Sequence, residues 1–287
     1  MVNFVLPIGD SIYRFYKQDI GMNNYLDGIL VSQGVWRTTA PERVLKAINY
    51  VKESRHKFVI GDCGAFTFFR TKELGFDVME WQIRKLFDWY DSVKVDYGLT
   101  YDYIVPHGNP SLAYYNSYDK EYIYTLKNLS EMKKIYKTGS WKFEPIGALQ
   151  FQNWENLRKA FEWAYKLDYK YVSVGGLVMG IPTPRDFHFY TKVIKIADEY
   201  AKKYNLKVHL LGVGWTRLLN YITNLDLNIY SVDSSSSYTS IARSEETNKE
   251  TYLKVFKYLE KQYTACHYAN FKPTFLTKYL NNDSLIN

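Results

Sequence analysis

The sequence predicts an α/β fold, a single (β/α)8 TIM-type barrel, and two patterns indicate it. Short apolar runs alternate with longer amphipathic segments along the chain, as in parallel sheets whose strands are covered on both faces. Acids, amides and glycines also fall at the carboxyl ends of many different runs, and such groups converge most readily if the sheet closes into a barrel. An open doubly wound sheet is the alternative fold.

The expected strands are eight short runs rich in β-branched and apolar residues. In chain order they span 3–7, 27–32, 57–62, 98–104, 145–150, 170–175, 207–212 and 228–233. Residues 8–26, between the first two runs, are less regular and contain glycine, so we expect a loop with some helix there.

The expected helices have apolar residues at helical spacing. The first, 41–54, has Pro41 in its first turn, a position that suits proline. The others span 78–92, 119–137, 153–167, 184–204 and 214–224, and a last helix is expected over 248–264. We therefore interpret residues 1–264 as the barrel and 265–287, rich in Tyr and Asn, as a C-terminal tail that forms no separate domain.

Composition excludes several classes of protein. The chain has 287 residues, 46% of them hydrophobic, which suits one domain with a sizeable core. Its two cysteines, Cys63 and Cys266, exclude a disulfide framework and a four-cysteine metal site. No apolar run reaches the roughly eighteen residues of a membrane span, and the first residues lack a secretory leader pattern. We therefore expect a cytoplasmic protein with no membrane partner, and the net charge of +7 permits a polyanionic one.

Six motifs place polar groups or glycines at the ends of predicted strands. They read GDCGAF (61–66), YDYIVP (101–106), GALQFQNWENLR (147–158), SVGGLVMG (173–180), HLLGVG (209–214) and VDSSSSYTSIAR (232–243). Asp62, Asp102 and Asp233 supply carboxylates, and the glycines allow a ligand to approach the backbone. The amide of Gln150 can both donate and accept, as recognition of a purine edge requires. Each motif alone is also typical of an ordinary turn.

In this order and spacing the motifs resemble the queuine/archaeosine tRNA-guanine transglycosylase superfamily, which includes relatives that insert 7-deazaguanines into DNA. The resemblance covers roughly residues 57–243. It implies a (β/α)8 barrel with its active site at the C-terminal rim of the strands. It also implies that guanine in a polynucleotide is exchanged for a free 7-deazaguanine base, with no cofactor. The target nucleotide must leave its stack to reach such a pocket.

The resemblance implies a role for each matching residue. Asp233 matches the nucleophile that attacks the anomeric carbon and forms a covalent glycosyl-enzyme. Asp62 matches the general acid/base that acts on the departing and incoming bases. The other matching positions bind substrate: Asp102 and Gln150 at the purine edge, Gly176 and Leu177 beside a 7-substituent with Gly175 next to them, Phe66 and Leu211 at the ring faces, Gly212 at a close-approach turn, and Arg243 near the rim.

Departures from the family bear on the polymer that is modified. Members that act on tRNA carry a zinc module of three Cys and one His after the barrel, whereas only Cys266 and His267 stand here. Two ligands do not hold structural zinc, so we predict no metal and favour DNA over tRNA. Cys63 stands where the family usually has Ser, and we interpret it as a small buried residue.

Three other interpretations stay open. The chain could perform the same exchange on tRNA, or be a catalytically inactive nucleic-acid-binding or partner subunit of the same fold. It could also be an unrelated barrel enzyme, because fold does not fix function. The presence of both candidate catalytic acids, Asp62 and Asp233, argues against an inactive subunit. The oligomeric state is open, with a homodimer as one arrangement, and Arg185, Arg217 and Arg243 either contact the polymer or face solvent.

Overall fold

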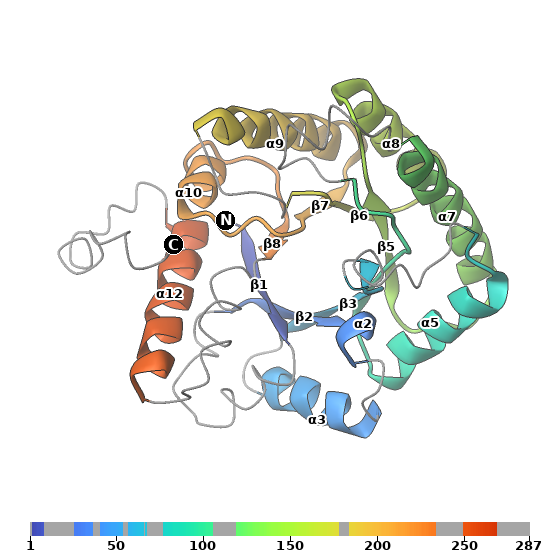
Figure 1. The fold of residues 1–287 in the computed structure, drawn as a ribbon, viewed down its shortest axis with the longest axis horizontal. Coiled ribbons are helices and arrows are strands. Elements are labelled where there is room, and N and C mark those ends of the chain that lie inside the picture. Colours follow the sequence, from blue (N-terminus) through green and yellow to red (C-terminus); the bar gives the residue numbers. More distant parts are fainter. Residues whose placement is uncertain are drawn as a thin grey trace.

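The chain folds into a closed barrel of eight parallel strands surrounded by helices (Figure 1). This arrangement is seen in a computed structural model, which describes residues 2–8, 26–36, 41–53, 57–65, 67, 77–105, 119–177, 184–233 and 249–268. The predicted (β/α)8 fold is therefore confirmed, and the open doubly wound sheet is wrong because β1 pairs with β8 and closes the ring.

The strands follow one another around the barrel in chain order. They are β1 (Asn3–Ile8), β2 (Gly28–Ser32), β3 (Phe58–Asp62), β4 (Tyr97–Leu99), β5 (Glu144–Leu149), β6 (Tyr171–Val174), β7 (Lys207–Leu210) and β8 (Ser231–Asp233). Every neighbouring pair is parallel. Because all strands run the same way, their carboxyl ends lie together at one end of the barrel.

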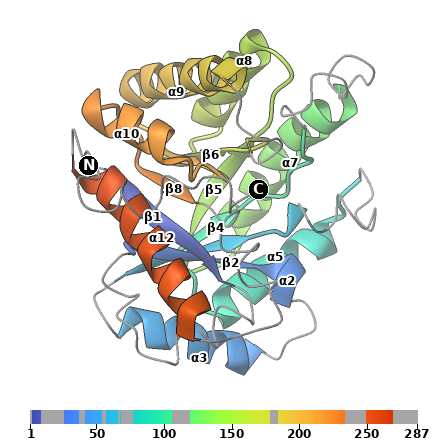
Figure 2. The same cartoon turned by 60° about the vertical axis from the view of Figure 1, so that its left-hand side comes forward.

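The helices lie outside the ring of strands (Figure 1). Those described are α2 (Gln33–Trp36), α3 (Pro41–Lys52), α5 (Glu80–Ser92), α7 (Asp119–Thr138), α8 (Trp154–Lys166), α9 (Pro184–Tyr204), α10 (Thr216–Asn224) and α12 (Lys249–His267). The last of them, α12, packs against α10 and β1 and so covers the seam where the barrel closes (Figure 2). Within the described ranges, no helix is both long and apolar enough to cross a membrane.

Alternating side chains divide the buried residues into two groups. One group lies inside the barrel and is mostly apolar: Val5, Leu30, Ile60, Leu99, Ile146, Ala148 and Tyr171. The other group fills the layer between strands and helices, where Phe87, Phe143 and Phe161 are among the largest fully buried side chains. Strands covered on both faces explain why the sequence shows nearly continuous apolar runs.

The amino-terminal end of the barrel is closed by aromatic rings. Tyr171 packs edge-on against Tyr97 and Tyr230, with ring centroids 4.9 and 5.2 Å apart. Lys207 places its Nζ 4.6 Å from the centroid of the Tyr230 ring. This end is therefore filled by side chains, and the polar residues of the predicted site belong to the other end.

The observed bounds differ from the predicted ones mainly at β4, β8 and α12. β4 ends at Leu99 and not at 104, and β8 begins at Ser231 and not at 228. The last helix continues to His267, three residues beyond its predicted end, so Ala265 and Cys266 are buried helix residues. The short helix α2 was not expected. Most of the irregular segment 8–26 and of the tail 265–287 lies outside the described residues.

Candidate functional site

Polar side chains gather at the carboxyl ends of the strands, which we call the mouth of the barrel. The mouth residues are Ser32, Asp62, Asp102, Gln150, Ser173, His209, Ser231 and Asp233. Side chains along a strand point alternately to its two faces, so residues two positions apart share a face. Ile60 lies inside the barrel, and Asp62, two residues later, therefore lies above it at the mouth. Four of the sequence-predicted residues, the three acids and Gln150, therefore converge.

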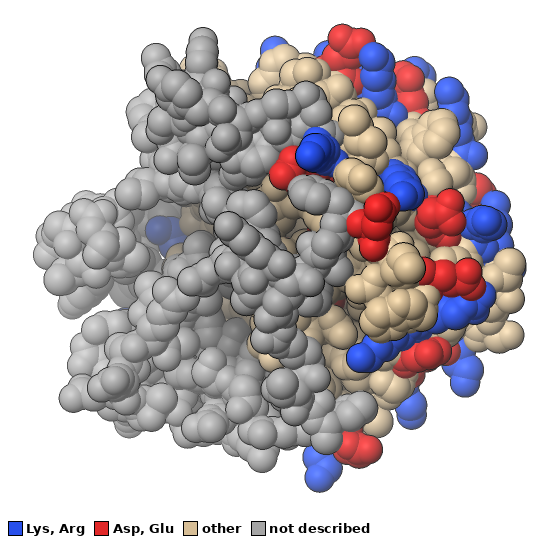
Figure 3. All heavy atoms as spheres, turned by 45° about the vertical axis from the view of Figure 1, so that its right-hand side comes forward, with Lys and Arg blue, Asp and Glu red and all other residues tan. Residues whose placement is uncertain are grey.

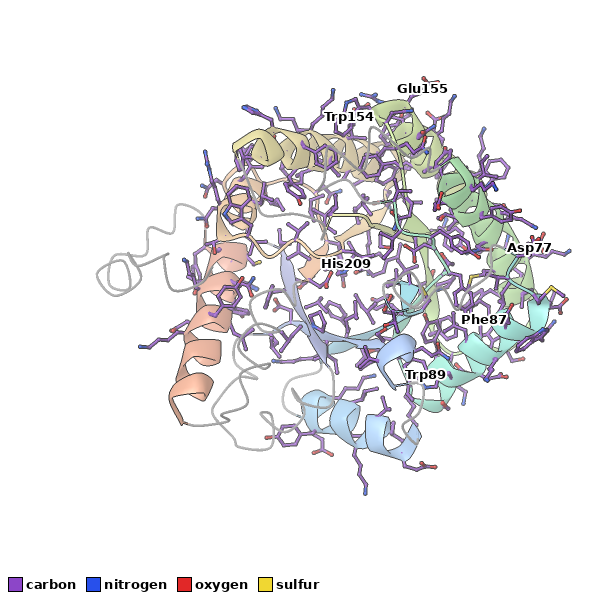
Figure 4. The ribbon with its side chains drawn as sticks, in the orientation of Figure 1. Asp77, Phe87, Trp89, Trp154, Glu155 and His209 are labelled. Carbon is purple, nitrogen blue, oxygen red and sulfur yellow. The ribbon has the colours of Figure 1, made fainter. Side chains whose placement is uncertain are left out.

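Asp233, the last residue of β8, is 6% exposed and its Oδ1 atom accepts two hydrogen bonds. The Gly212 backbone N–H donates at 2.8 Å and His209 Nε2 lies 3.1 Å away. His209 comes from β7, and its other ring nitrogen, Nδ1, lies 2.8 Å from Ser231 Oγ. Figure 4 shows His209 within the ring of strands. One carboxylate oxygen of Asp233 is thus fixed, and Oδ2 accepts no hydrogen bond from any described residue.

These residues form a hydrogen-bonded series that ends at Asp233, and the available donors determine where its protons lie. Burial raises the pKa of the Tyr171 hydroxyl well above its usual range, so Tyr171 keeps its proton and donates it to Ser231 Oγ, 2.6 Å away. Ser231 then donates to His209 Nδ1, and His209 donates from Nε2 to the Asp233 carboxylate. A neutral imidazole satisfies every link.

Asp62 ends β3 in a different environment. Its Oδ2 atom accepts the Gly64 N–H at 3.1 Å, and Gly64 needs its φ of 88° to make this turn. Burial raises the pKa of Asp62 to about 6, a hydrogen bond from Ser32 partly lowers it, and the charges of Asp102 and Asp233 raise it further. Asp62 therefore exchanges its proton near neutral pH, where a general acid/base works best.

Asp102 and Gln150 form a hydrogen-bonded pair. Gln150 Nε2 donates to Asp102 Oδ2 at 2.6 Å, and Gln150 Oε1 accepts the Val105 N–H at 3.2 Å, which fixes which end of the amide points to the acid. The Cys63 thiol also donates to this acid, with Sγ 3.5 Å from Asp102 Oδ1. Burial raises the pKa of Asp102, and the Gln150 and Cys63 hydrogen bonds partly offset that rise.

The glycine pair after β6 lies next to Asp102 and Gln150 and leaves space for them. A Cβ on Gly175 would collide with Gln150 Nε2 and lie 3.5 Å from Asp102 Oδ2. Gly176 has a φ of 77°, which favours glycine. Leu177 is 3% exposed, and its carbonyl accepts the Tyr190 hydroxyl at 2.8 Å. Gly175 thus leaves room for the Gln150 amide.

The remaining predicted residues fall in two groups. Leu211 is partly buried against the interior cluster, and Gly212, with φ 78°, points its N–H at Asp233. Phe66 and Arg243 lie outside the described residues, as does the serine run 234–237.

No Lys or Arg in the described ranges forms an ion pair with Asp62, Asp102 or Asp233. The described residues also contain no group of three or more His, Cys, Asp and Glu side chains placed to hold a metal ion. Cys266 is buried, and His267 Nε2 lies 2.8 Å from Asp27 Oδ2, so both belong to the packing of α12. The mouth is acidic and has no described cation to balance it.

Sequence reasoning missed His209, Ser231 and Ser32. His209 precedes Leu211 by two residues, so strand alternation would have placed both on the same side of β7. Ser231 stands two residues before Asp233 and could have been found in the same way. Ser173 also lies in this layer, with a fully buried hydroxyl that has no hydrogen-bond partner in the described structure.

Comparison of the sequence with models of known protein families gives no match, and comparison with curated proteins gives no significant match. The function is therefore inferred from the residues and geometry of the mouth.

Proposed function

We propose that this chain is a transglycosylase that exchanges guanine in a polynucleotide, DNA in preference to tRNA, for a free 7-deazaguanine base. One observation carries the proposal: two acids with different surroundings stand at the same mouth. Asp233 is held on one oxygen by two donors, whereas the pKa of Asp62 is raised to about 6. A carboxyl that exchanges its proton near neutral pH, beside a second carboxylate held by hydrogen bonds, is the combination that acid–base catalysis with nucleophilic attack requires.

The proposed reaction has two displacements at one carbon. Asp233 Oδ2 attacks the anomeric carbon of the target nucleotide, the bond from that carbon to N9 of guanine breaks, and Asp62 gives its proton to the leaving base. Asp62, now ionised, takes the N9 proton of the incoming base, whose nitrogen attacks the same carbon and releases Asp233. The proton on Asp62 is thereby restored, so the cycle balances without a cofactor.

Base recognition falls to Asp102 and Gln150. Their mutual hydrogen bond uses one amide proton of Gln150 and Oδ2 of Asp102, and the Cys63 thiol donates to Oδ1. The second amide proton and a further lone pair on Oδ1 are left for a base. The ring nitrogens and exocyclic amine of a guanine-type base complement such an acceptor–donor pair. The order of the motifs, which resembles the guanine transglycosylases, supports the same substrate class.

A labelling experiment tests the proposal. Purified protein is incubated with radiolabelled guanine or labelled 7-deazaguanines and with single-stranded DNA, duplex DNA or total tRNA. We expect label to enter DNA, and entry into tRNA alone would favour the alternative polymer. No incorporation into any polymer would contradict transglycosylase activity and favour the inactive-subunit interpretation.

Trapping identifies the nucleophile. A covalent protein–polymer adduct that survives denaturation should form with native protein, and with Asp62→Asn supplied with a polymer whose target nucleotide carries fluoride in place of guanine, because fluoride leaves without taking a proton. It should not form with Asp233→Asn. The last substitution keeps the size of the side chain and removes the attacking carboxylate. An adduct formed by Asp233→Asn would assign the covalent step to another residue.

A further inference from the structure

The hydrogen-bonded series that ends at Asp233 begins deep inside the barrel. We call the three residues behind Asp233 the interior series: Tyr171, Ser231 and His209. The Tyr171 hydroxyl lies 2.6 Å from Ser231 Oγ, and Ser231 Oγ lies 2.8 Å from His209 Nδ1. His209 Nε2 then lies 3.1 Å from Asp233 Oδ1. Three hydrogen bonds thus connect a tyrosine of β6 with the carboxylate at the end of β8.

The register of the strands brings these side chains together. His209 of β7 stands opposite Ser231 of β8, so the imidazole and the hydroxyl are neighbours. Tyr171 of β6 stands opposite Lys207, two residues before His209, and its hydroxyl reaches past β7 to Ser231. Each member of the interior series is at most 1% exposed. A ligand at the mouth therefore meets Asp233 and not the residues behind it.

Tyr171 has a fixed place and a fixed proton. Its ring lies in the apolar interior cluster and packs edge-on against Tyr97 and Tyr230. Burial raises the pKa of its hydroxyl well above the usual range, so the hydroxyl keeps its proton and donates it to Ser231 Oγ. Ser231 receives this donor on its oxygen, and its own proton is left for His209 Nδ1.

The hydrogen bond at Nδ1 determines what His209 presents to Asp233. In a neutral imidazole one ring nitrogen accepts a hydrogen bond and the other donates one. Because Ser231 donates to Nδ1, the ring proton lies on Nε2, which faces Asp233 Oδ1. The donor that Asp233 receives is thus set by two residues behind the imidazole.

Asp233 has no described cation that could replace this donor. On the described face that Figure 3 shows, Lys and Arg side chains lie on the outer surface among Asp and Glu side chains. None of the Lys and Arg residues that the structure describes forms an ion pair with Asp233. Its Oδ1 atom is held by the His209 ring and by the Gly212 N–H at 2.8 Å. The orientation of the carboxylate therefore depends on these two hydrogen bonds.

We propose that Tyr171 and Ser231 are positioning residues, which act through His209 to hold Asp233 with Oδ2 directed at the substrate. Oδ1 is occupied by two donors, whereas Oδ2 accepts no hydrogen bond from any described residue, so Oδ2 is the atom that attacks. Buried hydrogen bonds in series strengthen one another, so a loss at the far end weakens the contact with Asp233. Asp233 is a nucleophile only under the proposed function, and this role of Tyr171 and Ser231 rests on it.

Nitrogen NMR of protein with isotope-labelled histidine tests the interior series without any reaction. The chain has five histidines, and the signals of His209 are those that His209→Gln lacks. In native protein we expect the proton on Nε2 and a hydrogen-bonded Nδ1. Ser231→Ala and Tyr171→Phe should each move the Nδ1 signal, because Nδ1 loses its donor or that donor loses its orientation.

Ser173→Ala is the matched control for the spectra. Ser173 stands opposite His209 on the other neighbouring strand and is as fully buried as Ser231. Its hydroxyl has no hydrogen-bond partner in the described structure, so it does not belong to the interior series. We therefore expect Ser173→Ala to leave the Nδ1 signal of His209 in place.

The rate of adduct formation, followed over a range of polymer concentrations, measures the effect on Asp233. Tyr171→Phe removes one hydroxyl and should lower the maximal rate about tenfold, the order expected of one buried hydrogen bond, with KM within about twofold. The control is Tyr169→Phe. Tyr169 is equally buried and donates to the Leu129 carbonyl at 2.9 Å, but it lies in the layer between strands and helices. Its loss should leave the rate within about twofold.

A second background shows whether Tyr171 acts through His209. His209→Gln keeps an amide donor towards Asp233 and has no ring nitrogen facing Ser231. Adding Tyr171→Phe to this variant should change the rate by less than about twofold. A tenfold loss in both backgrounds would overturn the positioning role, because Tyr171 would then act by another route. Equal rates for Tyr171→Phe and Tyr169→Phe would overturn it as well.

The spectra and the rates together separate this role from the fate of the proposed function. If Tyr171→Phe moves the His209 signal but native protein forms no adduct, the control of His209 by Tyr171 is upheld and the transglycosylase is refuted. If native protein forms the adduct but neither Tyr171→Phe nor Ser231→Ala moves the signal, the positioning role is refuted and the transglycosylase stands.

Discussion

At the scale of single residues, the ionised carboxyl of Asp62 lowers the free energy of unfolding by an amount that depends on pH. Its pKa is about 6 in the folded protein and 3.8 in an exposed chain, so the folded state binds the proton more tightly. The carboxyl group therefore lowers stability increasingly as pH rises from about 4 to about 6, and the full cost is present above that range. Active sites often retain such destabilising groups because function requires them.

Asp62→Asn should therefore stabilise the protein at high pH while it abolishes exchange. We expect the free energy of unfolding to rise by about 1 to 2 kcal/mol at pH 8, less than the full linkage value because the side chain is only partly buried. The gain should become small near pH 3, where the carboxyl is mostly protonated in both states. Urea unfolding at the two pH values measures it. A gain that is the same at both would mean that ionisation is not its cause.

His209 offers a pair of substitutions that separates its two contacts. Gln places an amide near the position of Nε2, facing Asp233, whereas Asn places one near Nδ1, facing Ser231. If the donor to Asp233 positions the nucleophile, His209→Gln should keep the rate of adduct formation within about tenfold. His209→Asn should lower it by about 100-fold with little change in KM. Similar rates for both variants would assign His209 a structural role only.

At the scale of elements, the contact between Gln150, which follows β5, and Gly175, which follows β6, can be tested by a double-mutant cycle. Gly175→Ala would force its methyl group into Gln150 Nε2, so we expect a loss of about 1 to 3 kcal/mol in the free energy of unfolding. Gln150→Ala removes the obstructing amide, and Gly175→Ala should then cost under about 0.5 kcal/mol. Chemical denaturation of the four proteins measures the coupling. Additive losses would show that Gly175 is needed for another reason.

The strand pattern was predictable from sequence because strands that are covered on both faces form short, largely apolar runs, but the strand ends were not predictable. β4 was predicted to reach 104, and the residues after Leu99 are indeed buried. Their backbone N–H groups donate to side chains and not to a neighbouring strand. The Tyr103 N–H donates to Thr125 Oγ1, and the Val105 N–H donates to Gln150 Oε1. Such partners come from distant segments, so local pattern cannot reveal where the ladder stops.

The candidate site was predictable from sequence to about the same extent as the strands. Acids and amides at strand ends imply convergence once the sheet closes, so Asp102 and Gln150 were placed together correctly. The hydrogen-bonded chain from Tyr171 to Asp233 was not predicted, because it depends on the register that sets His209 opposite Ser231. Register is a property of the assembled sheet.

For the whole molecule, closure of the barrel depends on contacts between both ends of the described chain. Asp27 Oδ2 accepts the Phe4 N–H at 2.7 Å and lies 2.8 Å from His267 Nε2. Cys266 also accepts the Val2 N–H through its carbonyl at 3.2 Å. One carboxylate thus ties β1, the residue before β2 and the end of α12 together, as the position of α12 in Figure 2 suggests.

Asp27→Ala should therefore destabilise the whole protein. We expect a loss of about 2 kcal/mol in the free energy of unfolding, because the Phe4 N–H and His267 would lose their partner in a mostly buried setting. Asp77→Ala is the matched control, since it breaks an exposed ion pair with Lys127 and should cost under about 0.5 kcal/mol. Urea denaturation compares them, and equal losses would contradict a special role for Asp27.

The apolar interior below the mouth has an electrostatic consequence. Its dielectric constant is low, so it does not screen the charges of the acids above it. The electric field of these acids therefore extends outward through the opening. The described part of the mouth therefore favours a neutral base over an anionic ligand, and the phosphates of a bound polynucleotide have to lie outside it. We expect guanine to bind at least tenfold more tightly than guanosine monophosphate in calorimetric titrations, with the difference shrinking as salt is added. Equal affinities would show that the field is neutralised within the mouth.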